Sequence, residues 1–280
     1  MASQQVPSGA GGSNARNLAL RLAAAAVLIP VTLVLAWWGG WWWLVLVALA
    51  AIGLFVEWLM MVGSQREPGV VAGGAALVIA AVSVLCGRPE AAIGLCAAGA
   101  AVVAILCSVR RAWSTLGFLY AAAALLASML VRGSDVAGFQ ALIFVFLIVW
   151  VTDTLGYFVG RSVGGPKLWP RVSPNKTWAG ALGGFGGSLV VAIVSTVLGY
   201  LPLLPALLLG AGLSVMSQLG DLFESAVKRR FGVKDSSQLI PGHGGLLDRL
   251  DGYVAAIVAA ALIGFLRGDL DGIGRGLMVW

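Results

Sequence analysis

Long apolar runs, broken by short polar stretches, make up most of this chain. Residues 179–220 contain no Asp, Glu, Lys or Arg. A membrane-spanning helix needs about 20 mainly apolar residues, so this stretch predicts two spans that fold back near Pro202. Runs of comparable character lie at 18–38, 41–62, 69–87, 91–108, 113–131, 137–160, 179–199, 203–220 and 252–266. The pattern therefore predicts an all-α, polytopic integral membrane protein with about nine transmembrane helices.

Composition agrees with a membrane as the solvent and suggests a division of the chain. Of the 280 residues, 60% are hydrophobic and 11% are charged, with a mean hydropathy of +0.96, which is too apolar for a water-soluble globule. Residues 1–17 are polar and rich in Gly and Ser, so we expect a disordered tail. We expect N-terminal transmembrane helices over 18–132 and a catalytic transmembrane region over 133–280, with polar loops at 161–178 and 221–251.

Basic residues predict the orientation, because Lys and Arg in short loops stay on the cytoplasmic side. If the N-terminus is inside, the predicted loops place all but four of the 18 basic residues on the cytoplasmic side. The exceptions are Arg88, Arg132, Arg267 and Arg275. We therefore expect the N-terminus, both polar loops and the active site to face the cytoplasm.

The segment 221–251 carries the residue types that phosphate chemistry needs. If the preceding helix continues past residue 220, Asp221, Glu224, Ser225 and Lys228 share one of its faces. The glycines around His243 allow a turn whose N–H groups can approach an anion. Asp248 and Asp251 then lie three residues apart at the start of the last span, a placement that suits Mg²⁺ bridging to phosphates. An ordinary basic connector would have a similar composition.

An ordered series of residues resembles the signature of the phosphatidate cytidylyltransferase family. It comprises Ser225, Lys228, Arg229, Lys234, Asp235, Ser237, Pro241, His243, Gly244, Gly245, Asp248, Arg249 and Asp251. Upstream, Asp153, Tyr157, Gly160 and the run Ser173–Trp178 resemble the family's other cytoplasmic motif. One position departs from it, because Ala179 stands where the family usually has an acidic residue. The resemblance covers roughly residues 150–252.

The resemblance implies an enzyme that makes CDP-diacylglycerol and pyrophosphate from CTP and phosphatidic acid, in the cell inner (plasma) membrane. It implies that Asp221 and Asp248 hold Mg²⁺, with a second cation such as K⁺ nearby, and it suggests a homodimer. Asp251 would complete the metal site or orient Arg249. Membrane lipids are expected partners, and nucleic acid is not.

Other polar residues are candidates for substrate contacts. Asp153 lies in an otherwise uncharged span, where an ionisable group marks a functional site by default; we add it to the metal candidates, although a snorkelling acid is the alternative. The remaining candidates for contacts to CTP phosphates or the lipid headgroup are Lys228, Arg249, Ser173, Lys176, Thr177, Ser225, Arg229, Lys234, Asp235, His243, Gly244 and Gly245. The basic ones alternatively bind anionic lipid surfaces, and Pro174 makes a plain turn an alternative for the 173–177 cluster. His243 is expected to contact phosphate or shape the loop rather than bind Mg²⁺.

Some features have simpler explanations. Gly156, Gly160 and Gly164 recur at every fourth position, as in close helix packing. Glu57 has no evident partner in the sequence and is structural or unassigned. Two other functions remain open: a transporter or flippase for an anionic lipid or nucleotide, and a CTP-dependent lipid kinase that transfers the terminal phosphate. The absence of an inverted repeat and the one-sided polar residues disfavour the transporter.

Overall fold

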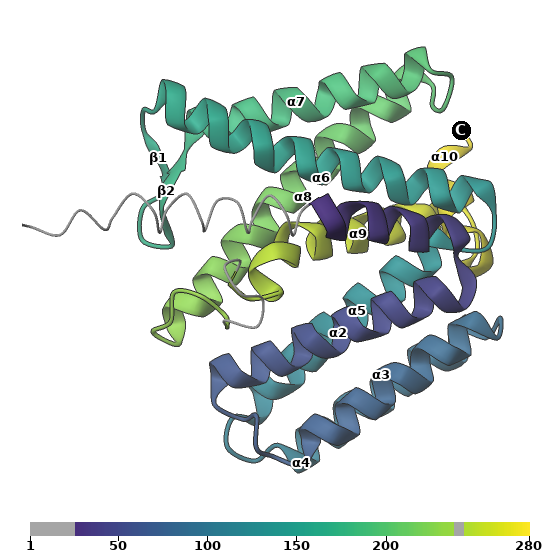
Figure 1. Cartoon of the computed structure of the whole chain (residues 1–280), viewed down its shortest axis with the longest axis vertical. Coiled ribbons are helices and arrows are strands. Elements are labelled where there is room, and N and C mark those ends of the chain that lie inside the picture. Colours follow the sequence, from purple (N-terminus) through teal and green to yellow (C-terminus); the bar gives the residue numbers. More distant parts are fainter. Residues whose placement is uncertain (1–25, 238–243) are drawn as a thin grey trace, which may run out of the picture.

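The computed structural model describes residues 26–237 and 244–280. The chain is a bundle of antiparallel helices with one small hairpin (Figure 1). After an apolar helix over Ala26–Trp38, the elements are α2 (Gly40–Val62), α3 (Gly69–Leu85), α4 (Pro89–Leu106), α5 (Arg111–Arg132), α6 (Val136–Val163), β1 (Lys167–Trp169), β2 (Ser173–Thr177), α7 (Trp178–Val197), α8 (Leu203–Arg230), α9 (Leu247–Arg267), the short helix η1 (Leu270–Gly272) and α10 (Ile273–Met278).

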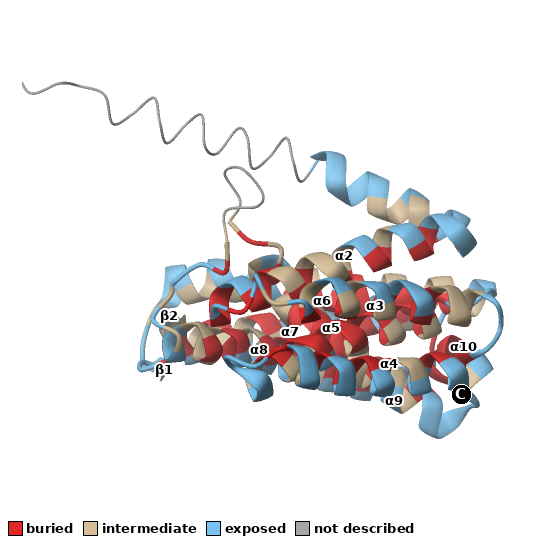
Figure 2. Ribbon diagram, turned by 90° about the horizontal axis from the view of Figure 1, so that it is seen from below, coloured by how far each residue is buried: buried red, intermediate tan, exposed pale blue. Residues whose placement is uncertain are grey.

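Seven helices within the described ranges are long and apolar enough to cross a membrane, which confirms a polytopic, largely helical chain. They are α2, α4, α5, α6, α7, α8 and α9. The runs expected at 18–38 and 69–87 contain the shorter described helices Ala26–Trp38 and Gly69–Leu85. The count of about nine spans therefore stays a prediction. Buried residues line the middle of the bundle (Figure 2). Many large apolar side chains are exposed, as expected for helices solvated by lipid.

Successive helices run in alternating directions, so the connectors gather at two ends (Figure 1). The segments after α2, α4, α6 and α8 lie at the end that also carries the hairpin β1–β2, which we call the hairpin end. The connectors after α5 and α7 and the C-terminal helix α10 lie at the opposite end. This alternation matches the sidedness that the basic residues predict.

Both predicted polar loops differ from the structure in their extent. The segment 161–178 is an antiparallel hairpin, with Lys167 opposite Thr177 and Trp169 opposite Ser173, rather than a plain turn. The segment 221–251 is helical at both ends, because α8 runs without a break to Arg230 and α9 begins at Leu247. In the described ranges, the regular elements are thus all helices except for this hairpin and an isolated β-bridge at Gly244.

Glycines allow the closest helix contacts. A Cβ added at Gly180 of α7 would lie 2.7 Å from the carbonyl oxygen of Gly156 and 3.1 Å from the Cα of Gly160, so α6 and α7 meet backbone to backbone. This confirms the packing predicted for these two α6 glycines. Gly164 was wrongly assigned to that contact: it has a φ of +69° at the end of α6 and faces open space.

Candidate active site

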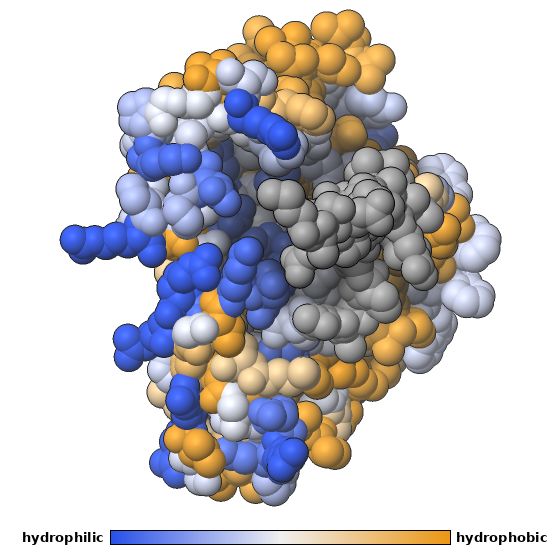
Figure 3. Space-filling model, turned by 60° about the vertical axis from the view of Figure 1, so that its left-hand side comes forward, coloured by the Kyte–Doolittle hydropathy of each residue, from blue (hydrophilic) through white to orange (hydrophobic). Residues whose placement is uncertain are grey.

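Hydrophilic side chains gather on the face of the hairpin end, while the surrounding surface is mostly hydrophobic (Figure 3). Beneath it, α6, the hairpin, α7 and α8 enclose a pocket of ≈ 750 Å³. Its lining includes Asp153, Lys176, Thr177, Gln218 and Asp221. We call it the polar pocket. Residues of the upstream motif and Asp221, which precedes the signature series by four positions, therefore meet in one cavity.

An ion pair joins the upstream motif to α8 across the polar pocket. The ammonium of Lys176 on β2 contacts Oδ2 of Asp221 on α8, and the two side chains are 28% and 31% exposed. Thr177 ends the hairpin and caps α7, since its Oγ1 accepts a hydrogen bond from the N–H of Gly180 at 3.1 Å. The cap fixes the entry into α7 and, with it, the position of Lys176 beside α8.

Three carboxylates lie within electrostatic range of one another here. Asp153 of α6 and Asp251 of α9 both interact with the charge of Asp221. Their proximity depends on a tight crossing of α8 and α9, because a Cβ at Gly220 would lie 2.5 Å from the carbonyl oxygen of Asp251. Asp153 is thus placed with the other candidate acids, as its position in an uncharged span predicted.

Asp248 belongs to a neighbouring cluster. Lys228 lies between two carboxylates, with its Nζ 2.7 Å from Oδ1 of Asp248 and 2.6 Å from Oε2 of Glu224. Asp248 also accepts hydrogen bonds from the N–H groups of Ser236 at 3.1 Å and Gly245 at 3.0 Å. Glu224 is buried. Lys228, predicted to contact a substrate, is thus held between two acids of the protein itself.

Glu57 of α2 is the residue that sequence analysis missed. It is 1% exposed, and its two carboxylate oxygens accept four hydrogen bonds. They come from the hydroxyls of Ser236 (3.0 Å) and Ser237 (2.7 Å) and from the N–H groups of Leu246 and Leu247 (2.8 Å each). An ionisable group in an apolar run was the available signal, but its partners lie 179 to 190 positions away in the chain.

The glycine turn predicted to bind phosphate lies only partly within the described residues. Pro241, Gly242 and His243 fall outside them. Gly244 has a φ of +83°, as expected for such a turn, but the N–H of Gly245 donates to Asp248 and the next two N–H groups donate to Glu57. The anions that these three groups bind here are carboxylates of the protein.

The remaining candidates lie around the same end. Ser225 donates weakly to Asp221, with its Oγ 3.4 Å from Oδ1, and Arg229 donates to the carbonyl of Val233. Lys234 and Asp235 are exposed, and Ser173 is half-buried at the start of β2. Within the described residues, no three His, Cys, Asp or Glu side chains are grouped closely enough to hold a metal by themselves.

An apolar cavity of ≈ 350 Å³, which we call the apolar pocket, lies beside this polar region. It is bordered by the Ala26–Trp38 helix, α2, α5, α6 and α9, and Arg249 and Leu250 line it where α9 begins. Trp150, which lines it, is three residues before Asp153 on α6, which lines the polar pocket. The two cavities thus lie near adjacent turns of one helix.

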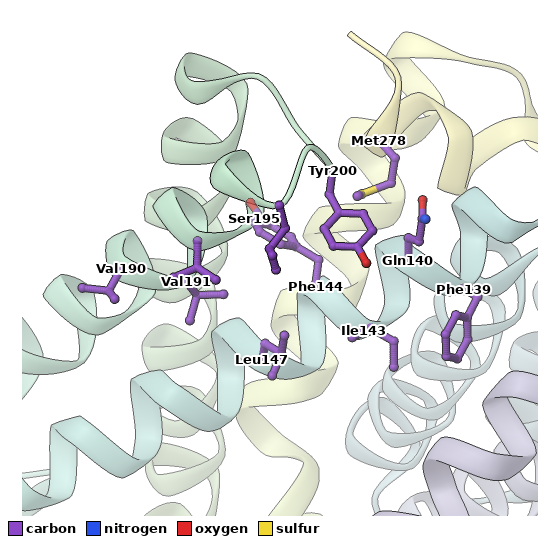
Figure 4. Close-up of a pocket in the computed structure, with 12 residues that line it drawn as sticks. Phe139, Gln140, Ile143, Phe144, Leu147, Val190, Val191, Ser195, Tyr200 and Met278 are labelled. Atoms are coloured by element: carbon purple, nitrogen blue, oxygen red, sulfur yellow. The ribbon is translucent and has the colours of Figure 1, made fainter.

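A further cavity of ≈ 370 Å³ lies at the opposite end, between α6, α7 and α10 (Figure 4). Its lining includes Gln140, Tyr200 and Met278, whose side chains point toward one another. No Asp, Glu, Lys, Arg or His lines it. It has none of the charged groups that phosphate chemistry needs, so the polar pocket at the hairpin end is the candidate active site.

Comparison with known proteins decides the family. A model described as the cytidylyltransferase family matches residues 19–266, nearly the whole chain. This chain belongs to the cytidylyltransferase family. The family resemblance predicted from residues 150–252 is thereby confirmed, and the match extends over the N-terminal helices as well.

Several relatives of this chain are named phosphatidate cytidylyltransferase. The chain is 40% identical to a phosphatidate cytidylyltransferase of Brucella abortus biovar 1 (strain 9-941), over 91% of this chain and 96% of that protein. It is 45% identical over 126 residues to that of Bacillus subtilis (strain 168), covering 44% of this chain and 47% of the relative. It is 48% identical over 119 residues to that of Staphylococcus epidermidis (strain ATCC 35984), covering 42% and 46%.

Proposed function

We propose that this enzyme transfers the cytidylyl group of CTP to phosphatidic acid, giving CDP-diacylglycerol and pyrophosphate for phospholipid biosynthesis. The family and the names of its relatives support this activity. The observation that carries it is the ion pair between Lys176 and Asp221. It joins Lys176 of the upstream motif to Asp221, just before the signature series, in one polar pocket, beside further carboxylates and at the end of an apolar bundle.

CTP occupies the polar pocket in this proposal. The cavity of ≈ 750 Å³ is lined by cations and by hydrogen-bonding side chains, and its size falls in the range that small-molecule ligands use. Lys176 then neutralises charge on the triphosphate as pyrophosphate leaves. Lys167 and Arg161 line the same cavity and extend the basic surface that attracts the nucleotide.

Phosphatidic acid binds with its acyl chains in the apolar pocket. That cavity is lined almost entirely by apolar side chains of the helices, and Arg249 lies where the lipid headgroup would meet water. Arg249 is exposed, and its guanidinium suits bidentate recognition of a phosphate monoester. Since the two cavities border neighbouring turns of α6, this places the lipid phosphate close to the nucleotide.

Mg²⁺ is the metal that fits the donors. Asp153, Asp221, Asp248 and Asp251 offer only oxygen, which Mg²⁺ prefers. Mg²⁺ sites in nucleotide enzymes commonly use one or two carboxylates and take their other ligands from substrate phosphates and water. We propose Asp221 and Asp248 as the principal ligands, Asp251 and Asp153 as supporting ones, and a second cation such as K⁺ nearby. Bound Mg²⁺ would stabilise charge on the transferring phosphoryl group.

The reaction needs no nucleophile from the protein. The ionised oxygen of the lipid phosphate forms a bond to the α-phosphorus of CTP, and the bond from that phosphorus to the bridging oxygen of the β-phosphate breaks. The bond electrons leave with pyrophosphate. The residues of the chain bind, orient and neutralise charge: Lys176 at the triphosphate and Arg249 at the headgroup.

The proposal includes a location in the cell inner (plasma) membrane, with the N-terminus and the hairpin end in the cytoplasm, where CTP is. Most basic residues in the described ranges lie in the connectors of that end or in the helix ends beside them, as short cytoplasmic loops favour. A homodimer in the membrane is part of the same proposal. Chemical crosslinking of the protein in native membranes and labelling of single cysteines placed in each connector would test both statements.

Labelled CTP tests the activity. Purified protein in detergent is incubated with phosphatidic acid, Mg²⁺ and either α- or γ-labelled CTP. We expect the α-label in the lipid and the γ-label in pyrophosphate. The γ-label in the lipid would establish a lipid kinase instead, and no label in the lipid would favour transport.

A further inference from the structure

Glu57 lies on α2, outside both signature motifs, yet its carboxylate is bonded to both ends of the segment 236–247. Oε2 accepts from the hydroxyl of Ser236 and the N–H of Leu247, and Oε1 accepts from the hydroxyl of Ser237 and the N–H of Leu246. All four distances lie between 2.7 and 3.0 Å. A buried carboxylate with four donors is fully committed to one geometry.

The same segment also binds Asp248 from its other side. Ser236 offers its hydroxyl to Glu57 and its N–H to Asp248. Gly245 donates its N–H to Asp248, and the two residues after it donate theirs to Glu57. Each end of the segment is therefore held between two carboxylates, and Asp248 receives its backbone donors only where Glu57 keeps them.

Gly245 lets the two ends come close to Glu57. A Cβ at Gly245 would collide with the hydroxyl of Ser236 and lie 2.6 Å from Oε2 of Glu57. Only glycine therefore fits between this hydroxyl and the carboxylate. Leu247, which donates its N–H to Glu57, is the first residue of α9, and Asp248 follows it in the first turn.

We propose that Glu57 is a positioning residue for cytidylyl transfer: it fixes the described ends of the segment, residues 236–237 and 245–247, and thereby orients the carboxylate of Asp248. The inference rests on the proposed function. The inference gives α2 a role in the site, although α2 belongs to neither signature motif. Groups that orient metal ligands from behind typically change metal affinity or activity by about 10–100-fold when replaced.

The first test is Glu57→Gln, which keeps the size of the side chain but replaces one acceptor oxygen with an NH₂ group. Two of the four donors then lose their acceptor. We expect kcat to fall by about 10–100-fold and the Mg²⁺ concentration for half-maximal activity to rise. Glu57→Asp keeps both acceptor oxygens on a shorter stem and should recover part of the loss.

The matched control is Glu67→Gln. Glu67 is an acid at the same end of the bundle whose Oε1 accepts from the N–H of Val109 at 3.2 Å, in a connector that does not reach the site. It should leave kcat and the Mg²⁺ requirement unchanged. Comparison of the two variants separates the effect of removing any hydrogen-bonded carboxylate at this end of the bundle from the effect of removing that of Glu57.

A readout without substrate completes the test. Hydrogen exchange of the protein, without CTP or added metal, should accelerate at the N–H groups of Leu246 and Leu247 in Glu57→Gln and stay unchanged elsewhere in α2 and α9. The double variant Ser236→Ala, Glu57→Gln should lose less activity than the two single losses added together. Both changes affect the same hydrogen bond, which the hydroxyl of Ser236 donates to Glu57.

Two results would overturn the inference. One is normal kcat and normal Mg²⁺ dependence in Glu57→Gln. The other is a loss of activity that accompanies a general loss of thermal stability and faster exchange along the whole of α2, which would make the role purely structural. If wild-type protein forms no labelled lipid at all, the proposed function fails instead, and the exchange data still report whether Glu57 holds the segment.

Discussion

Lys176, on a strand of the hairpin, and Asp221, in the last third of α8, form an ion pair that closes one side of the polar pocket. Lys176 belongs to the upstream motif, and Asp221 lies just before the signature series. The ammonium of Lys176 contacts the same carboxylate of Asp221 that is proposed to bind Mg²⁺. Binding of CTP with Mg²⁺ would therefore give both side chains new partners. This relationship leads directly to the first two predictions.

Replacing Asp221 with Asn should abolish turnover without unfolding the protein. The substitution keeps the shape of the side chain and removes the charge that would bind Mg²⁺, so we expect a loss of at least about 100-fold in kcat. Asp248→Asn should behave alike. Asp271→Asn, in η1 at the opposite end, is the control and should be fully active. Near-normal Mg²⁺-dependent activity in both site variants would refute the assignment of the acids.

Lys176→Met should weaken CTP binding more than it weakens binding of the lipid. The change removes the cation that faces the triphosphate, and we expect KM for CTP to rise about tenfold, the cost of one charge-assisted hydrogen bond. Arg171→Met removes a positive charge from the hairpin turn outside the polar pocket and should have little effect. Steady-state kinetics with each substrate varied in turn measures the difference. An equal change in both KM values would argue against a CTP site here.

Gly220→Ala should separate α8 from α9. The new methyl group would lie 2.5 Å from the carbonyl oxygen of Asp251 and 2.6 Å from the Cβ of Ala255, so the helices must shift, at a cost of about 1–3 kcal/mol. Activity should fall as well, because Asp221 and Asp251 move apart. Gly212→Ala lies on the same helix, faces open space and should be neutral or slightly stabilising. Thermal unfolding in detergent and kcat are measured for both.

Ala179→Glu should be tolerated. Ala179 is half-buried in the first turn of α7, directly after Trp178, where a negative charge is favourable to the helix dipole by about 0.3–1 kcal/mol. We expect an unchanged or slightly raised melting temperature and no large change in rate. A large gain in kcat would show that the acid usual in the family contributes to catalysis and that this chain works without it.

The sequence predicted the bundle well because a membrane span leaves a strong local signal. Each apolar run fixes a helix from composition alone, and the charged residues after residue 220 were correctly placed on a continuation of α8. The hairpin over 167–177 was missed, since its strands have only 3 and 5 residues, too few for an alternation to mark a half-buried strand.

The site was predicted only in part, because motifs are local in the sequence and the contacts between them are not. Motif residues such as Asp221 and Lys176 were found as separate clusters, and the tertiary structure joined them. Residues whose role depends on distant partners left no pattern. Glu57 is the clearest case: its four donors come from the far end of the chain, and no local spacing could reveal them. Lys228, whose substrate contact stays a prediction, lies between Glu224 and Asp248. Helix spacing indicated the neighbour on α8 but could not show the one that faces it from α9.

The bonds of Glu57 also limit how this chain can be recombined. The two signature motifs lie within residues 150–252 and resemble a transferable catalytic module. A chimaera that joins residues 133–280 to an unrelated set of N-terminal helices would nevertheless leave two serine hydroxyls and two backbone N–H groups without their buried acceptor. Exchange of the catalytic half between distant relatives should therefore succeed only when α2 is transferred with it.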